Sequence, residues 1–174
     1  RIVVIRGHRP VELTVSEILR ANTDQLVAIL QRELELKERK LQDELHYRTL
    51  ERIFIEERIY QRIEQCKTAA AVVAAVYEGF RPFARQLVRE LTDPDVDRLL
   101  QVRIRRISLF DIQQHREEME RVKADLAETR KHLKQLVKFA IAHLEGLLAR
   151  YEPLYPRRTR SSRHDEIDAR EVAF

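Results

Sequence analysis

The sequence predicts a mainly α-helical fold: a long antiparallel two-helix coiled coil, capped at its far end by a small helical knob and preceded by a short β-hairpin. Apolar residues recur at steps of mostly three and four over residues 113–151, the spacing of an apolar seam along one side of a helix. A second, less regular stripe occupies residues 15–47. Charged residues make up 36% of the chain and only 3 residues are glycines, which favours long solvated helices over sheets.

The first 14 residues predict the hairpin. Residues 2–5 are a β-branched run, a Gly-His-Arg-Pro turn follows, and residues 11–15 alternate apolar and polar side chains. Thr14 or Ser16 is expected to cap the next helix, because Glu17 stands three residues after Thr14, the spacing of a capping box.

Residues 15–47 and 113–151 predict the two limbs of the coiled coil. Both are too polar for the inside of a globule, and most helix stability comes from packing an apolar face, so each needs a partner of similar length. The first seam consists of Val15, Ile18, Leu19, Leu26, Ile29, Leu30, Leu34, Leu41 and Leu45. The returning seam consists of Met119, Val122, Leu126, Thr129, Leu133, Leu136, Ala140, Leu144, Leu147 and Tyr151.

Residues 48–112 between the limbs predict the knob. From residue 48 the chain is apolar around more of the helix circumference, which indicates burial on several sides. Three further helices are expected. The first starts at Thr68 and ends at a C-terminal cap at Gly79. The second covers residues 84–91, and the third starts at Asp93, its cap, with Pro94 in its first turn. Ser108 or Asp111 would cap the return limb.

The last stretch, residues 152–174, predicts an exit linker toward a further domain that the chain does not include. It contains two prolines and a basic cluster of Arg157, Arg158 and Arg160. Because the sequence also starts inside a strand pattern, we expect it to be a piece of a longer protein.

No residues predict a catalytic, cofactor or metal site. The six histidines lack metal-ligand spacing and are interpreted as solvated helix residues: His8, His46, His115, His132, His143 and His164. Three glycines could hardly build a phosphate loop. Arg103, Arg105 and Arg106 are interpreted as outward arginines of a structural helix rather than as a nucleic-acid contact.

Charge and cysteine content place only loose limits on partners and location. The 33 basic residues are offset by 29 acidic ones, so a polyanionic partner is permitted but not required. A single cysteine, Cys66, fits a reducing cytoplasm, and no apolar run approaches the length of a membrane span.

Two segments carry a resemblance to a known family. Leu-Leu-Gln-Val-Arg-Ile-Arg-Arg-Ile-Ser at residues 99–108 and Arg-Arg-Thr at residues 157–159 resemble bacterial type IIA DNA topoisomerase A subunits, closer to topoisomerase IV than to gyrase. The resemblance covers essentially the whole chain. It implies the C-terminal part of the breakage-reunion region, from the last hairpin of the tower domain to the junction with the C-terminal domain.

The resemblance implies a C-gate: a knob through which two A subunits dimerise and which opens to release the transported duplex. DNA and the B subunit would be partners, with ATP and Mg on the B subunit. The catalytic tyrosine of the family lies upstream, so the fragment alone should be inactive. Tyr151 follows an arginine as that tyrosine does, but it continues the apolar seam and precedes Glu152-Pro153, so it is rejected as catalytic.

The knob contains more apolar surface than a bundle of about 60 residues can readily bury, which predicts a homodimer formed through the knob. The residues expected at this interface are Leu50, Phe54, Leu99, Leu100, Ile104, Ile107 and Phe110. The expected hinge residues, where the limbs meet the knob, are Tyr47, Arg48, Asp111 and Ile112. The alternative is a non-enzymatic coiled-coil dimerisation or scaffold protein, which would lack an upstream winged-helix tyrosine.

Overall fold

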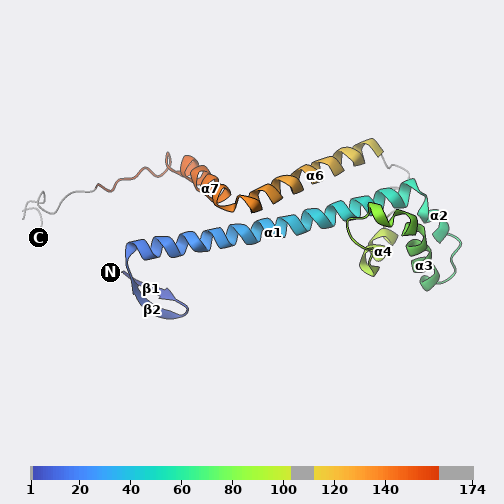
Figure 1. The fold of residues 1–174 in the computed structure, drawn as a ribbon, viewed down its shortest axis with the longest axis horizontal. Helices are drawn as coiled ribbons and strands as arrows, with labels where there is room; N and C mark the ends of the chain where they lie inside the picture. The colour runs from blue at the N-terminus through green and yellow to red at the C-terminus, as the bar shows by residue number, and fades with distance from the viewer. Residues whose placement is uncertain (1, 103–111, 161–174) are drawn as a thin grey trace, which may run out of the picture. The chain divides into compact units, whose positions relative to one another are not determined.

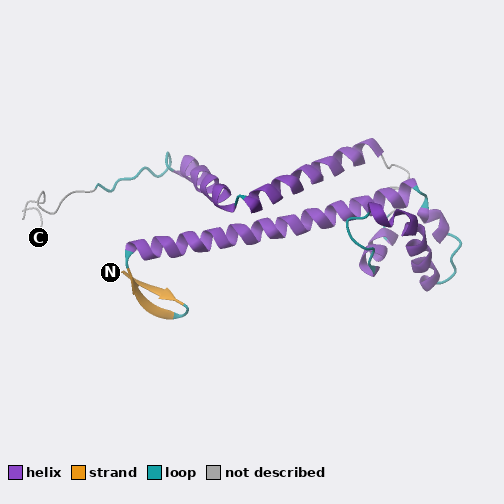
Figure 2. Cartoon of the chain, in the orientation of Figure 1, coloured by secondary structure: helices purple, strands orange, loops and turns teal. Residues whose placement is uncertain are grey.

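The structure is a computed structural model that describes residues 2–102 and 112–160. It is mainly α-helical, with a short antiparallel hairpin at the N-terminus, as the sequence predicts (Figures 1 and 2). The chain forms two compact units, Arg1–Leu136 and Val137–Phe174. The first contains the hairpin, the long helix, the knob and the first part of the return limb.

The hairpin consists of β1 (Ile2–Arg6) and β2 (Arg9–Leu13), with Arg6 opposite Arg9. Its two-residue turn places Gly7 at φ 56° and His8 at φ 65°, the left-handed conformations that suit the twist of a tight hairpin. Strand β2 therefore starts earlier than expected and includes Pro10, which a two-stranded sheet tolerates at an edge.

Helix α1 (Val15–Glu56) is the longest element, and its start confirms the predicted capping box. The Glu17 amide donates to Thr14 Oγ1 at 3.3 Å, and the Thr14 amide donates to Glu17 Oε2 at 2.7 Å. The helix continues past residue 47, where the limb was expected to meet the knob, so one helix contributes to both. No proline or glycine interrupts it before Arg58, whose positive φ of 52° turns the chain into the next helix.

Helix α6 (Ile112–Lys134) packs antiparallel to α1 (Figure 1). The cross-helix pairs run in opposite order along the two helices: Glu38 with Arg130, Arg48 with Glu118, and Glu51 with His115. The predicted seam is confirmed here, since Met119, Val122, Leu126 and Thr129 are all buried.

The return limb differs from the expected single helix over residues 113–151. It is divided into α6 and α7 (Leu136–Tyr151), and α7 belongs to the second unit. At the break, the amide of Gln135 is shared between the carbonyls of Lys131 and His132, both at 3.1 Å, a pattern common at helix ends. The basic last turn of α6 favours an end there, because cations are stabilised near helix C-terminal carbonyls.

The knob consists of the last turns of α1 with α2 (Ile59–Ile63), α3 (Ala69–Phe80), the 3₁₀ helix η1 (Arg81–Gln86) and α4 (Asp93–Leu100). These elements enclose one apolar core made of Leu50, Ile53, Phe54, Ile59, Val76, Phe80, Val96 and Leu99.

Three local predictions in the knob need correction. Gly79 does not cap α3 but lies inside it. Glycine suits this position because an added Cβ would stand 2.8 Å from Ile59 Cγ2. The helix expected over residues 84–91 is replaced by η1, whose first turn contains Pro82. The cap of α4 is Thr92 rather than Asp93, in a capping box with Asp95, while the first-turn proline is confirmed.

Candidate functional site: the knob and the basic groove

The seven predicted interface residues divide into three groups in the structure. Leu50 and Leu99 are 0% exposed and Phe54 is 3% exposed, so these three side chains stabilise the knob's own core and are not available to a second chain. Leu100, one position along α4, is 39% exposed. Ile104, Ile107 and Phe110 lie outside the described residues.

Exposed apolar side chains remain on the knob. Besides Leu100, Val88 is 48% exposed and Tyr77 is 36% exposed, with the Tyr77 hydroxyl donating to Asp93 Oδ1 at 2.7 Å. Sequence periodicity could not separate these residues from their buried neighbours. In the short helix α4, which of two adjacent leucines faces inward depends on where α1 and α3 lie.

Of the four expected hinge residues, Tyr47 and Arg48 make side-chain contacts in the structure. Tyr47 and Arg48 stand inside the unbroken helix α1, and the Arg98 guanidinium lies 3.6 Å from the centroid of the Tyr47 ring. Arg48 forms ion pairs with Glu44 on its own helix and with Glu118 on α6. Ile112 begins α6, and Asp111 lies outside the described residues.

A buried polar cluster connects α1 to α4. Asp95 accepts two hydrogen bonds from Arg89, at 2.6 and 3.0 Å, and others from the amide and hydroxyl of Thr92. Burial raises the pKa of Asp95, but the hydrogen bonds from Arg89 and Thr92 outweigh it and hold that pKa well below its usual range. The carboxylate is therefore charged at neutral pH.

His46 on α1 faces this cluster, with Nε2 3.4 Å from Asp95 Oδ2. The side chain is 1% exposed, and burial lowers its pKa, helped by the positive charge of Arg89. His46 is therefore a neutral core residue at neutral pH.

A second histidine is buried between α1 and α6, where His115 Nε2 lies 4.0 Å from Glu51 Oε2. The interpretation of all six histidines as solvated is thus wrong for His46 and His115. The signal available was position, since His115 precedes Met119 by four residues and so extends the apolar seam by one turn.

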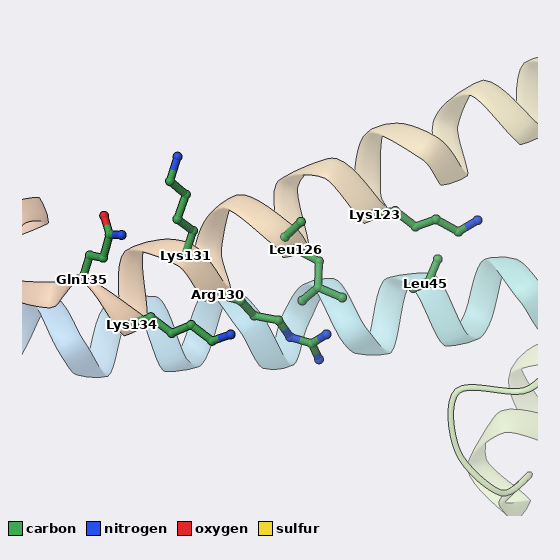
Figure 3. A pocket seen from close by; sticks show the side chains of 8 residues that line it. Leu45, Lys123, Leu126, Arg130, Lys131, Lys134 and Gln135 are labelled. Atoms are coloured by element: carbon green, nitrogen blue, oxygen red, sulfur yellow. The ribbon is translucent and has the colours of Figure 1, made fainter.

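An open groove lies between α6 and α1 near the end of α6 (Figure 3). Its lining residues are Leu45, Lys123, Leu126, Ala127, Arg130, Lys131, Lys134 and Gln135. Four of these eight are cations, around a mainly apolar floor. The sequence analysis noted basic clusters only at residues 103–106, which lie outside the described residues, and 157–160, and it assigned neither to a binding site. It missed the cations of the groove, because they stand among acidic residues in the sequence.

Among the described residues, no group of three or more potential metal ligands occurs, and none of the described helices is long and apolar enough to cross a membrane. Tyr151, rejected as a nucleophile, ends α7 and is 43% exposed.

Comparison with known proteins finds a relative that aligns with nearly the whole chain. The chain is 27% identical over 172 residues to the A subunit of DNA topoisomerase 4 from Borreliella burgdorferi, an alignment that covers 99% of the chain and 28% of that relative. The chain thus spans little more than a quarter of the relative's length. Residues 1–145 match the family described as the A subunits of DNA gyrase and topoisomerase IV. This protein therefore belongs to the family of DNA gyrase/topoisomerase IV A subunits.

Proposed function

We propose that the chain is the C-gate and primary dimerisation module of a type IIA topoisomerase A subunit, of the topoisomerase IV kind. The observation that carries this proposal is a knob with its own closed core, placed at the end of the antiparallel α1 and α6 pair. Membership of the A-subunit family favours this role over a plain scaffold.

The knob suits an interface that must open and close. Its internal core does not depend on a partner, because Leu50 and Leu99 are already fully buried within one chain. Leu100, Val88 and Tyr77 then offer apolar surface to a second copy. Burial of such surface is non-directional, so the contact can be lost during opening and recovered on closing.

Helix α1 suits the role of a lever. It is 42 residues long and unbroken, which at about 1.5 Å per residue gives a rod of about 63 Å. Movement at the knob would be transmitted along it, with the Arg48 and Glu118 ion pair connecting both limbs beside the knob. We propose bending at Tyr47, Arg48, Asp111 and Ile112, beside the knob, so the lever is the part of α1 that precedes Tyr47.

The whole enzyme would supply the chemistry. In this proposal the tyrosine that cleaves DNA lies in another part of the A subunit, and ATP and Mg bind the B subunit. The fragment alone would be inactive, and the enzyme would act in the cytoplasm on DNA as a homodimer of A subunits.

Sedimentation of the 174-residue chain tests the dimer. The wild type should be dimeric at tens of micromolar, and Leu100→Glu should be monomeric with an unchanged helical circular dichroism spectrum. Leu36→Glu is the matched control, because Leu36 is also exposed but lies on α1 away from the knob, and it should stay dimeric. A monomeric wild type, or a dimer unaffected by Leu100→Glu, contradicts the proposal.

A cross-link tests the gate. In a full-length A subunit that includes this chain, Cys66→Ser is combined with Leu100→Cys. Oxidation should then join the two subunits by a disulfide across the knob interface. DNA cleavage should continue while release of the passed duplex stops. Release at the normal rate from the cross-linked enzyme would show that the knob is not the exit.

A further inference from the structure

The groove near the end of α6 gathers its cations on one face of the helix. Lys123, Ala127, Arg130, Lys131 and Lys134 follow one another at steps of one, three and four residues, so their positions share one broad face of α6. Figure 3 shows Lys123, Arg130 and Lys134 reaching along or over α1, with Lys131 on the outer side of α6.

The charges on this face are only partly neutralised. Lys123 pairs with Glu120 at 2.7 Å, and Arg130 pairs with Glu38 of α1 at 2.7 Å. Within the described residues, Lys131 and Lys134 make no ion pair, and no carboxylate lines the groove. Lys131 and Lys134, which have no ion pair within that part of the chain, lie beside Lys123 and Arg130, whose side chains are half exposed. The four cations together form a positive strip.

The length of this strip fits a phosphate backbone. Lys123 and Lys134 are 11 positions apart, which corresponds to about 16 Å along the helix axis. Duplex DNA carries one phosphate per strand for about each 3.4 Å of axis, so the strip runs past about five phosphates of one strand. The flanking Leu45 and Leu126 present no polar groups that could read base edges.

A simpler role accounts for part of this arrangement. Cations in the last turn of a helix are stabilised by its unpaired carbonyls, which applies to Lys131 and Lys134. It does not apply to Lys123, which stands about three turns from the end of α6 yet lines the same groove.

We propose that the groove of α6 between Lys123 and Lys134 binds the phosphate backbone of duplex DNA, without sequence preference. This inference rests on the proposed function, in which a duplex passes the limbs. Lys131 and Lys134 contribute most to the binding, because no carboxylate has to be displaced from them. The contact is electrostatic, so it weakens steeply with salt, as transient passage of a duplex requires.

The test is a binding titration of the 174-residue chain with two short duplexes of unrelated sequence, between about 50 and 200 mM salt. Lys131→Gln/Lys134→Gln should reduce the slope of log affinity against log salt by about two, roughly one for each phosphate contact removed. Both duplexes should bind equally. Arg116→Gln/Arg121→Gln is the matched control: it removes the same charge from α6 outside the groove and should leave the slope unchanged.

Lys131→Arg/Lys134→Arg separates charge from helix stability. It keeps both cations and should restore wild-type affinity and slope. An unchanged slope in the glutamine variant, an equal loss in the control, or no binding by the wild type at low salt overturns the inference. Sedimentation tests the proposed function separately. A dimer that fails to bind DNA refutes only DNA binding by the groove, and a monomer that binds DNA refutes only the dimeric gate.

Discussion

Gly79 and Gly146 both lie inside helices, yet adding one methyl group to each should change stability in opposite directions. At Gly79 the new Cβ would stand 2.8 Å from Ile59 Cγ2 and 3.3 Å from Ile59 Cγ1. Rotation of χ1 is a costly way to relieve this contact, because a β-branched side chain in a helix has one strongly preferred χ1 rotamer. Ile59 is 1% exposed and surrounded by the knob core, so it has no free space to move into.

The magnitude follows from two opposing terms. Replacing glycine by alanine in a helix stabilises the helix by up to about 1 kcal/mol. Overpacking a core typically costs about 1 to 3 kcal/mol. Gly79→Ala should therefore lower the free energy of unfolding by about 1 kcal/mol, or the melting temperature by about 2 to 4 °C for a chain of this size.

Thermal unfolding followed by circular dichroism measures this difference, with Gly146→Ala as the matched control. Nothing lies within 4 Å of a Cβ at Gly146, so the helix-propensity gain should remain and α7 should become more helical. In an Ile59→Ala background the γ carbons are gone, and Gly79→Ala should become stabilising. A Gly79→Ala variant that melts at or above the wild type, with Ile59 intact, would refute the packing argument.

Three further predictions concern the core and the polar cluster of the knob. Leu50→Ala removes a 0% exposed side chain and should cost about 2 to 5 kcal/mol, measured by urea unfolding. Asp95→Asn should cost about 1 to 2 kcal/mol, because it removes the charge that Arg89 and Thr92 bind; a midpoint equal to the wild type would show that the cluster contributes nothing. Acid should destabilise the fold in two steps. The folded state lowers the pKa of His46, so the unfolded state takes up that proton first and stability falls below about pH 6.5. The lowered pKa of Asp95 adds a second loss below about pH 4. His46→Gln should flatten the first step only, and equal urea midpoints at pH 7.5 and 5 in the wild type would contradict this account.

The sequence predicted most of the secondary structure because the relevant interactions are local. The Thr14 and Glu17 capping box depends on residues three apart, and it forms as expected. The seam of α6 depends on steps of three and four, and Met119 and Leu126 are buried as expected. Thr68 likewise caps α3 by accepting from the Ala71 amide.

Local rules failed where a distant neighbour decides. A glycine near a helix end normally indicates a C-cap, but Gly79 is required by Ile59, which belongs to another helix. A histidine among charged residues normally indicates a solvated face. His46 is buried because α4 covers it, and His115 is buried where α6 packs against α1; the carboxylates of Asp95 and Glu51 lie opposite them.

The candidate sites show the same division. Composition and periodicity by themselves determined a mainly helical chain with two amphipathic limbs and an apolar-rich segment between them. Only the tertiary structure decided that Leu99 stabilises the core while Leu100 remains exposed, because adjacent residues of a helix point in different directions and the packing partners choose between them. The structure likewise placed Lys123 and Lys134 in one groove by positioning α6 against α1, since the shape of a surface depends on how elements pack and not on the order of residues within one of them.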